Sequence, residues 1–126
     1  MTAVPAGSPP WALVAMFGIA GALHFVVPQA YERIMPPWLP YPRALVLASG
    51  AAELLGAIGL LVPGWRVAAG WWLILVLAAV FPANVQMLLD GLARPTPGWG
   101  RALLWARLPL QGLLMWWVWR SAVRAG

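Results

Sequence analysis

The sequence contains no cysteine and no lysine, and it carries few charges of either sign. Without cysteine there is no disulfide framework, thiol redox pair, cysteine nucleophile, zinc–thiolate site or iron–sulfur site. Charged residues make up 9% of the 126 residues, whereas soluble domains carry roughly 25%. So few charged residues could not give a soluble domain of this size a hydrated surface. This composition argues against a soluble enzyme and against a disordered tail.

The net charge of +5 does not indicate a nucleic-acid partner. The eight basic residues are all arginines, and they are scattered along the chain without forming a run. A nucleic-acid interface normally needs a basic cluster. Most of these arginines instead flank apolar blocks, where the guanidinium can reach lipid headgroups. We therefore expect the lipid bilayer, and no nucleic acid, as a partner.

Apolar residues, by contrast, make up 63% of the chain. They gather in four blocks of 17 to 23 residues: Trp11–Val27, Ala44–Val62, Val67–Leu89 and Ala102–Trp119. A helix needs ~20 residues to cross a membrane, whereas a membrane barrel would show shorter alternating segments. Short connections favour antiparallel neighbours. The expected fold is all-α, a four-helix transmembrane up-down bundle that forms a single domain over residues 1–126.

The first apolar block could also be a secretory signal, because Ala20-Gly21-Ala22 resembles a cleavage site. No basic residue precedes the block, which favours a retained helix. The arginines are shared too evenly between the two sides of the expected bundle to fix its orientation by the positive-inside rule. The exclusive use of arginine indicates a GC-rich bacterial genome. The expected location is therefore the bacterial inner membrane, with several spans.

The first loop is unusual in its proline content. Residues 28–35 place their apolar side chains on one helical face, which predicts a short helix in the membrane interface: Tyr31, Ile34 and Met35. The next segment, Met35–Pro42, contains four prolines and should be stiff and extended. It is either a turn that returns the chain to the membrane or a rigid lid that carries Trp38 and Tyr41 over the bundle.

Glu53 lies in the middle of the second apolar block. A charge at that depth costs ~2.5 to 3.5 kcal/mol on insertion scales, so Glu53 should face the interior and find a partner or stay protonated. Arg107 is the expected partner, because a rise of ~1.5 Å per residue places both at similar depth below one membrane face. His24, Asn84 and Gln111 fall in the same half of the membrane. The sequence therefore predicts one polar cluster.

Prolines and small residues surround this predicted cluster. Pro82 and Pro109 lie inside expected helices, where each frees the carbonyl four residues earlier as an acceptor. Small residues allow close helix approach at the same depth: Gly18 and Ala22 in the first block, and Ala48, Ala52 and Gly56 in the second.

The cluster has three open interpretations. It is a structural network that fixes helix register, a ligand or proton site, or a contact with a partner protein. His24 alone is a poor metal or haem ligand because the chain has no second histidine. Ser49 lies one turn before Glu53 without a neighbouring histidine, so it is expected to be a packing hydroxyl rather than a nucleophile. We find no catalytic motif, and we do not expect an enzyme acting on its own.

Short motifs occur in order between residues 18 and 117: Gly21-Ala22-Leu23-His24-Phe25 with Pro28, Ile34-Met35-Pro36-Pro37-Trp38-Leu39-Pro40, Ser49-Gly50 with Glu53, Gly59-Leu60-Leu61, Phe81-Pro82-Ala83-Asn84 with Met87, and Arg107-Leu108-Pro109-Leu110-Gln111. In this order they resemble the DoxX-like family of small four-helix membrane proteins. The wider family is similar to a quinone-linked thiosulfate oxidoreductase subunit, to components of oxidative-stress systems, and to proteins that assist membrane-protein assembly or export. Its cysteine-bearing relatives perform thiol chemistry, which this chain cannot do.

The expected function is that of an accessory membrane subunit. It would hold a small lipophilic molecule, such as a quinone, against His24, Glu53, Asn84, Arg107 and Gln111. The alternative is an assembly factor or structural subunit of a larger membrane complex or homo-oligomer, with no ligand. A proton-coupled carrier is disfavoured because four short helices leave little room for alternating access.

Overall fold

The computed structural model describes residues 9–33, 35 and 37–124, and within these residues it is helical with no strand. Its elements are α1 (Trp11–Val26), α2 (Pro28–Arg33), α3 (Pro42–Leu61), the 3-10 turn η1 (Pro63–Trp65), α4 (Arg66–Leu92), α5 (Gly98–Val118) and the π-helical turn η2 (Trp119–Arg124). The expected all-α class is confirmed. The four apolar blocks correspond to α1, α3, α4 and α5, and the short helix of the first loop corresponds to α2.

Two helices are long and apolar enough to cross a membrane. They are α3, with 20 residues, and the continuous helical stretch Pro63–Leu92, with 30. The first apolar block forms only the 16 residues of α1. Helix α5 has 21 residues, but its arginines and glutamine leave it less apolar than α3 and α4. The described residues thus contain two candidate spans, whereas the sequence predicts four.

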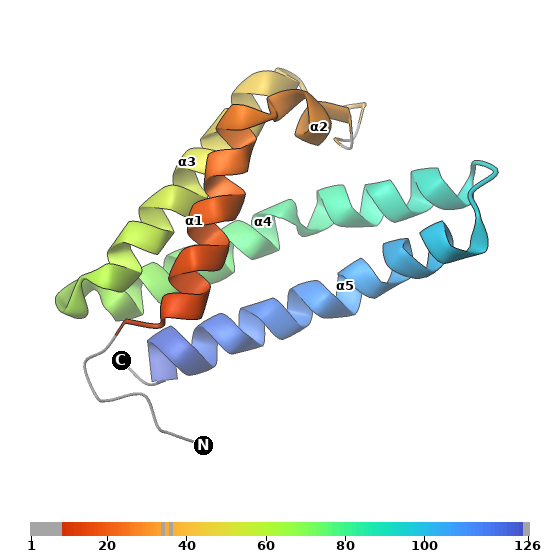
Figure 1. Cartoon of the computed structure of the whole chain (residues 1–126). Helices are drawn as coiled ribbons and strands as arrows, with labels where there is room; N and C mark the ends of the chain where they lie inside the picture. Colours follow the sequence, from red (N-terminus) through yellow and green to blue (C-terminus); the bar gives the residue numbers. More distant parts are fainter. Residues whose placement is uncertain (1–8, 34, 36, 125–126) are drawn as a thin grey trace.

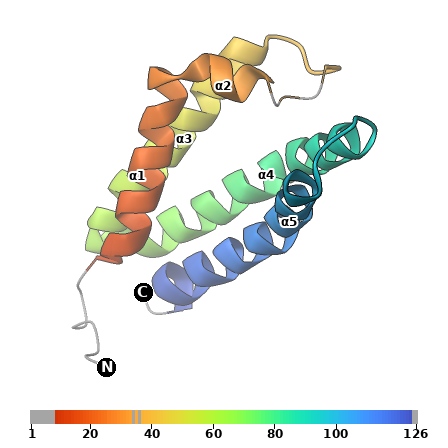
Figure 2. The same ribbon diagram turned by 45° about the vertical axis from the view of Figure 1, so that its right-hand side comes forward.

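The helices form two antiparallel hairpins, α1 with α3 and α4 with α5, which are joined by the α3–α4 turn (Figure 1). The hairpins meet at the end where α1 begins and diverge toward the end where α2 lies, as a second view confirms (Figure 2). We call these the closed end and the wide end. The up-down order of the helices is as expected, but the four do not pack evenly around one axis.

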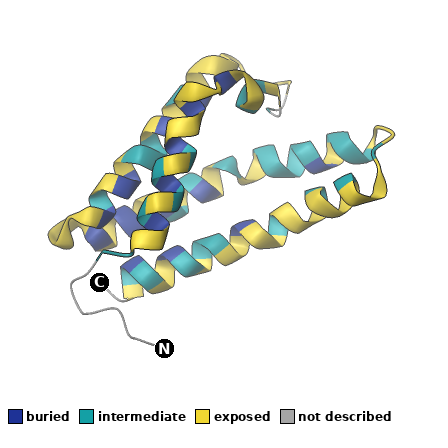
Figure 3. Cartoon of the chain, viewed as in Figure 1, coloured by how far each residue is buried: buried dark blue, intermediate teal, exposed yellow. Residues whose placement is uncertain are grey.

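A hydrophobic core fills the closed end (Figure 3). It brings together side chains of α1, α3, α4, α5 and η2: Leu13, Phe17, Ala57, Leu60, Ala69, Leu73, Leu77, Val118 and Ala122. Five of them are fully buried: Leu13, Leu60, Leu73, Val118 and Ala122. The outer faces of the helices remain exposed. Because the core is confined to one end, it holds the two hairpins together there and leaves the wide end to other side chains.

Helices α1 and α3 approach closely through a pair of glycines. A Cβ built on Gly50 would lie 2.5 Å from His24 Cβ and 2.9 Å from the carbonyl oxygen of Gly21. Gly18, which we expected on this interface, has nothing within 4 Å of such a Cβ, and Gly56 packs against α4. The glycine pair therefore sets the position of His24 against α3.

The proline-rich segment turns instead of extending. Residues 37–40 form a turn and a bend, and Tyr41 adopts a left-handed conformation with φ 52° before Pro42 begins α3. Proline fixes φ but leaves ψ free, so it suits the corner of a turn as well as an extended segment. The chain must reverse between α2 and α3, and it does so here. Ile34 and Pro36 lie outside the described residues.

Candidate functional site

His24 lies near the C-terminal end of α1, buried against α3. Its Nδ1 lies 2.7 Å from the carbonyl oxygen of Ala20. A carbonyl only accepts, so Nδ1 carries the proton and donates it. The same nitrogen lies 3.7 Å from Glu53 Oε2, and the ring of Tyr31 from α2 stacks on the imidazole at 3.8 Å between centroids. Three elements thus meet at this histidine.

Glu53 occupies the middle of α3, and its side chain is only 13% exposed. Its Oε2 atom is buried and has no hydrogen-bond partner among the residues that the structure describes. Leaving a buried acceptor unsatisfied costs ~1 to 3 kcal/mol, and more when it is charged. Glu53 also lines the cavity described below, so its carboxylate group is the natural place for a donor of a bound molecule.

A chain of hydrogen bonds joins α5 to α4 on the other side of the site. Arg107 Nη2 donates to Asn84 Oδ1 at 3.3 Å. Asn84 Nδ2 in turn donates to Gln111 Oε1, and Gln111 Nε2 donates to the carbonyl of Leu77. Each side-chain amide atom of Asn84 and Gln111 in this chain has a partner of the right kind. The sequence predicted a carbonyl acceptor near Pro82, at Ala78, and the acceptor used is the carbonyl one residue earlier.

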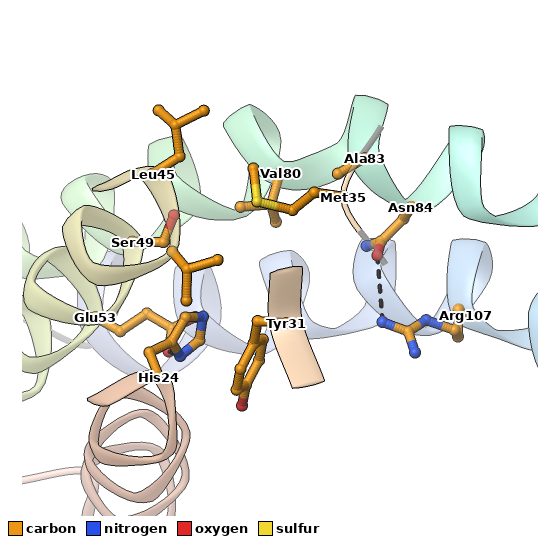
Figure 4. A pocket seen from close by; sticks show the side chains of 11 residues that line it. His24, Tyr31, Met35, Leu45, Ser49, Glu53, Val80, Ala83, Asn84 and Arg107 are labelled. Atoms are coloured by element: carbon orange, nitrogen blue, oxygen red, sulfur yellow. Dashed lines mark hydrogen bonds and ion pairs between the residues drawn. The ribbon is translucent and has the colours of Figure 1, made fainter. Parts of the chain in front are cut away.

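A cavity of about 210 Å³ separates these two groups. Side chains from every helix of the fold, and one from the segment after α2, line it (Figure 4): His24, Tyr31, Met35, Leu45, Val46, Ser49, Glu53, Val80, Ala83, Asn84 and Arg107. In Figure 4 the pair His24 and Glu53 stands on one side, Asn84 and Arg107 stand on the other, and Tyr31 lies between them. The lining is apolar apart from these polar groups and Ser49.

The expected ion pair between Glu53 and Arg107 does not form. Among the described residues, Arg43 forms an ion pair with Glu32, and Glu53 instead lies 3.7 Å from His24 Nδ1, which is charged only when the imidazole is doubly protonated. The reason lies in the divergence of the hairpins, since α5 packs on α4 and the cavity separates it from α3. The structure does bring His24, Glu53, Asn84 and Arg107 to one cavity, and Gln111 reaches Asn84 just beyond its wall.

The two aromatic residues expected on a lid, Trp38 and Tyr41, are not among those that line the cavity. Trp38 Nε1 donates to Gln86 Oε1 of α4 at 3.4 Å, which links the α2–α3 connection to the other hairpin. Tyr41 is 79% exposed. Tyr31 and Met35 line the cavity instead. Their shared apolar face is visible in the sequence, but the sequence alone indicates only a membrane-facing surface.

An ion pair that sequence reasoning missed anchors α2. Arg43 Nε and Nη2 donate to the two carboxylate oxygens of Glu32 at 2.9 and 3.1 Å. These hydrogen bonds hold the pKa of the Glu32 carboxyl below its ordinary value. Because the pair ties α2 to the first turn of α3, it fixes the helix that carries Tyr31.

Burial raises the pKa of the Tyr31 phenol, and the nearby carboxylate of Glu53 raises it further. A phenolate is the charged form, so both low polarity and a negative neighbour disfavour it. Tyr31 therefore faces the cavity as a neutral phenol. A neutral phenol can both donate and accept a hydrogen bond.

A second cavity, of about 400 Å³, lies on the outer side of α3 and α4. It is lined by apolar and small residues, together with two tryptophans: Leu55, Gly56, Ile58, Gly59, Val62, Trp65, Ala68, Ala69 and Trp72. Because this lining is apolar, the polar cavity is the better candidate for a specific site.

No group of three or more histidine, cysteine, aspartate or glutamate side chains able to hold a metal ion occurs in the described part of the chain.

One family model matches the chain. It covers residues 13–122, nearly all of the helical region, and its description is "Domain of unknown function (DUF8561)". No curated protein and no solved structure matches the chain significantly.

Proposed function

The chain belongs to the DUF8561 family, and we propose that it is a multi-pass, DoxX-like protein of the bacterial inner membrane. In this proposal α1, α3, α4 and α5 all cross the bilayer. The protein is an accessory subunit that holds a small lipophilic molecule, such as a quinone headgroup, in the polar cavity. The single observation that carries the proposal is that cavity, with its unsatisfied carboxylate, inside an otherwise apolar fold.

The exposure of the apolar helices supports a bilayer environment. Only 28% of the apolar window of α3 and 17% of that of the Pro63–Leu92 stretch are buried within the chain. Leu55, Ile58 and Leu75 are more than half exposed. Each Å² of apolar surface left in water forgoes roughly 25 cal/mol, and acyl chains cover such surface without loss. Helix α5, at ~1.5 Å per residue, is long enough to cross ~30 Å of hydrocarbon.

The size and lining of the cavity support a small ring-shaped ligand. An apolar cavity of ~150 Å³ is sufficient to hold benzene, so about 210 Å³ accommodates a substituted single ring. Ionisable groups inside a membrane are expensive and are expected to serve a function. Arg107, at the exposed side, can orient a carbonyl oxygen, while Glu53 offers an acceptor at the inner side.

Mild detergent extraction of the intact protein followed by native mass spectrometry tests the proposal. We expect a co-extracted small molecule in the wild type and a strongly reduced amount in Glu53→Gln. Asp90→Asn is the matched control, because Asp90 accepts from Gln86 and does not line the cavity. Repeated ligand-free preparations that keep their fold would refute the ligand-binding role.

The hydrogen-bond chain from Arg107 to Leu77 favours the alternative function, a structural subunit or assembly factor without a ligand. Every link of that chain is made within the protein, as expected of a network that fixes the register of α5 on α4. Under this alternative, Gln111→Leu lowers thermal stability and weakens association with a stoichiometric membrane partner. The wild type would then carry no small molecule.

A further inference from the structure

The polar cavity has two chemically opposite ends. At the inner end Glu53 Oε2 is buried and has no donor among the described residues. At the outer end the exposed Arg107 guanidinium offers only donors, and it gives one bond to Asn84 Oδ1. Arginine has five N–H groups, so donors remain for a ligand. A carboxylate at one end and a guanidinium at the other give the cavity a fixed polarity.

The neighbours of Glu53 do not cancel this polarity. His24 Nδ1 is engaged with the carbonyl of Ala20, and at 3.7 Å it lies beyond hydrogen-bond distance from the carboxylate. Arg107 and Glu53 do not form an ion pair across the cavity. The wall between the two ends is apolar apart from Tyr31 and Ser49. The Glu53 end therefore lacks a donor and the Arg107 end has unused donors until a ligand binds.

We propose that the ligand is a single-ring molecule with a hydroxyl or amine donor at the Glu53 end and a carbonyl, carboxylate or other acceptor at the Arg107 end. This inference rests on the proposed ligand-binding function and specifies the ligand class. A molecule with acceptors only, such as a quinone, leaves the carboxylate unsatisfied. A quinol, whose hydroxyls both donate and accept, satisfies both ends. Among headgroups of the quinone type proposed above, the cavity thus selects the reduced, hydroxyl-bearing form over the fully oxidised form.

A pair of matched probes tests the polarity. 4-Hydroxyacetophenone has a donor and an acceptor at opposite ends of one ring, and 4-methoxyacetophenone differs by methylation of the donor. Binding of each to the full chain in detergent is measured by isothermal titration or saturation-transfer spectroscopy. We expect the hydroxyl probe to bind at least about tenfold more tightly, as for a hydrogen bond to a charged group.

Variants at the two ends give different patterns. Glu53→Gln should reduce the preference for the hydroxyl probe, because a neutral amide is a weaker acceptor. Arg107→Gln should weaken both probes by a similar factor and leave the preference in place. Asp90→Asn should change neither, and circular dichroism verifies that each variant is folded.

The outcomes separate this inference from the proposed function. Saturable binding of both probes with equal affinity overturns the inference and leaves ligand binding standing. A preference that survives in Glu53→Gln also overturns it, because the donor then attaches elsewhere. Absence of saturable binding for both probes counts against the proposed function itself.

Discussion

Tyr31 is the residue at which the short helix, the histidine and the carboxylate of the site meet. Its ring stacks on His24, and burial together with the charge of Glu53 raises the pKa of its phenol. The protonated phenol is therefore favoured in the folded protein. Its contribution to stability is fully present below the ordinary pKa of 10.0 and is lost as pH rises through the folded value.

An alkaline titration in a Tyr41→Phe background isolates this group, because the chain has two tyrosines. Ultraviolet difference spectroscopy should give a midpoint above 10.0 for Tyr31. Adding Glu53→Gln should lower that midpoint while leaving it above the ordinary value, since burial is the larger cause. A midpoint at or below 10.0 in the folded protein would show that Tyr31 is not packed against the site.

Single residues also show which parts of the site could be predicted from the sequence. Glu53 stands out in the sequence because a carboxylate inside an apolar block is costly unless a partner or a ligand compensates it. Tyr31 could be assigned only to an apolar face, because a sequence does not show that α2 folds back over His24. Likewise, the pairing of Arg43 with Glu32 depends on the turn between them, which the prolines do not determine.

At the scale of elements, the contact between α1 and α3 depends on two glycines. A methyl group at Gly50 would meet His24 Cβ and the backbone carbonyl of Gly21, and backbone cannot move aside as a flexible side chain can. We expect Gly50→Ala to destabilise the protein by ~1 to 3 kcal/mol and to displace His24 from Glu53. Thermal or denaturant unfolding in detergent measures the loss.

Gly18→Ala is the control for that substitution, since it lies in α1 with nothing within 4 Å of the added methyl. It should be neutral or stabilising by up to ~1 kcal/mol, because alanine favours helix over glycine. Equal stability of the two variants would contradict the close approach of α1 and α3 at Gly50.

The helices themselves could be predicted because long apolar blocks between polar loops favour long helices, and the bounds of α3 and α4 follow those of the expected spans closely. The proline segment could be predicted only in part: a turn was one of its two interpretations and is what the structure shows, whereas its stiff, extended form was wrong. Prolines at 37 and 40 limit φ, yet the direction of the chain depends on ψ and on where α3 must begin. The turn at Tyr41, with its left-handed backbone, is set by tertiary structure and has no local signal in the sequence.

At the scale of the whole molecule, the relative height of residues along the helices could be predicted, but the lateral arrangement of the helices could not. The helical rise places Glu53 and Arg107 at similar heights, and both do line one cavity. Whether the helices that carry these two residues contact each other depends on which pairs of helices pack together. The hydrophobic periodicity of the sequence does not determine that. The core at the closed end joins the hairpins there, and at the other end Glu53 and Arg107 stand apart across the cavity (Figure 4).

A double-mutant cycle distinguishes this arrangement from a bundle held together by an ion pair. Because Glu53 and Arg107 form no salt bridge, we expect Glu53→Gln and Arg107→Gln to combine additively within ~0.5 kcal/mol in unfolding free energy. The cycle of Asn84→Ala with Gln111→Ala is the positive control, since these amides are hydrogen-bonded to each other, and it should show coupling beyond that margin. Strong coupling between Glu53 and Arg107 would mean that the hairpins close over the cavity, and the space for a ligand would then be lost.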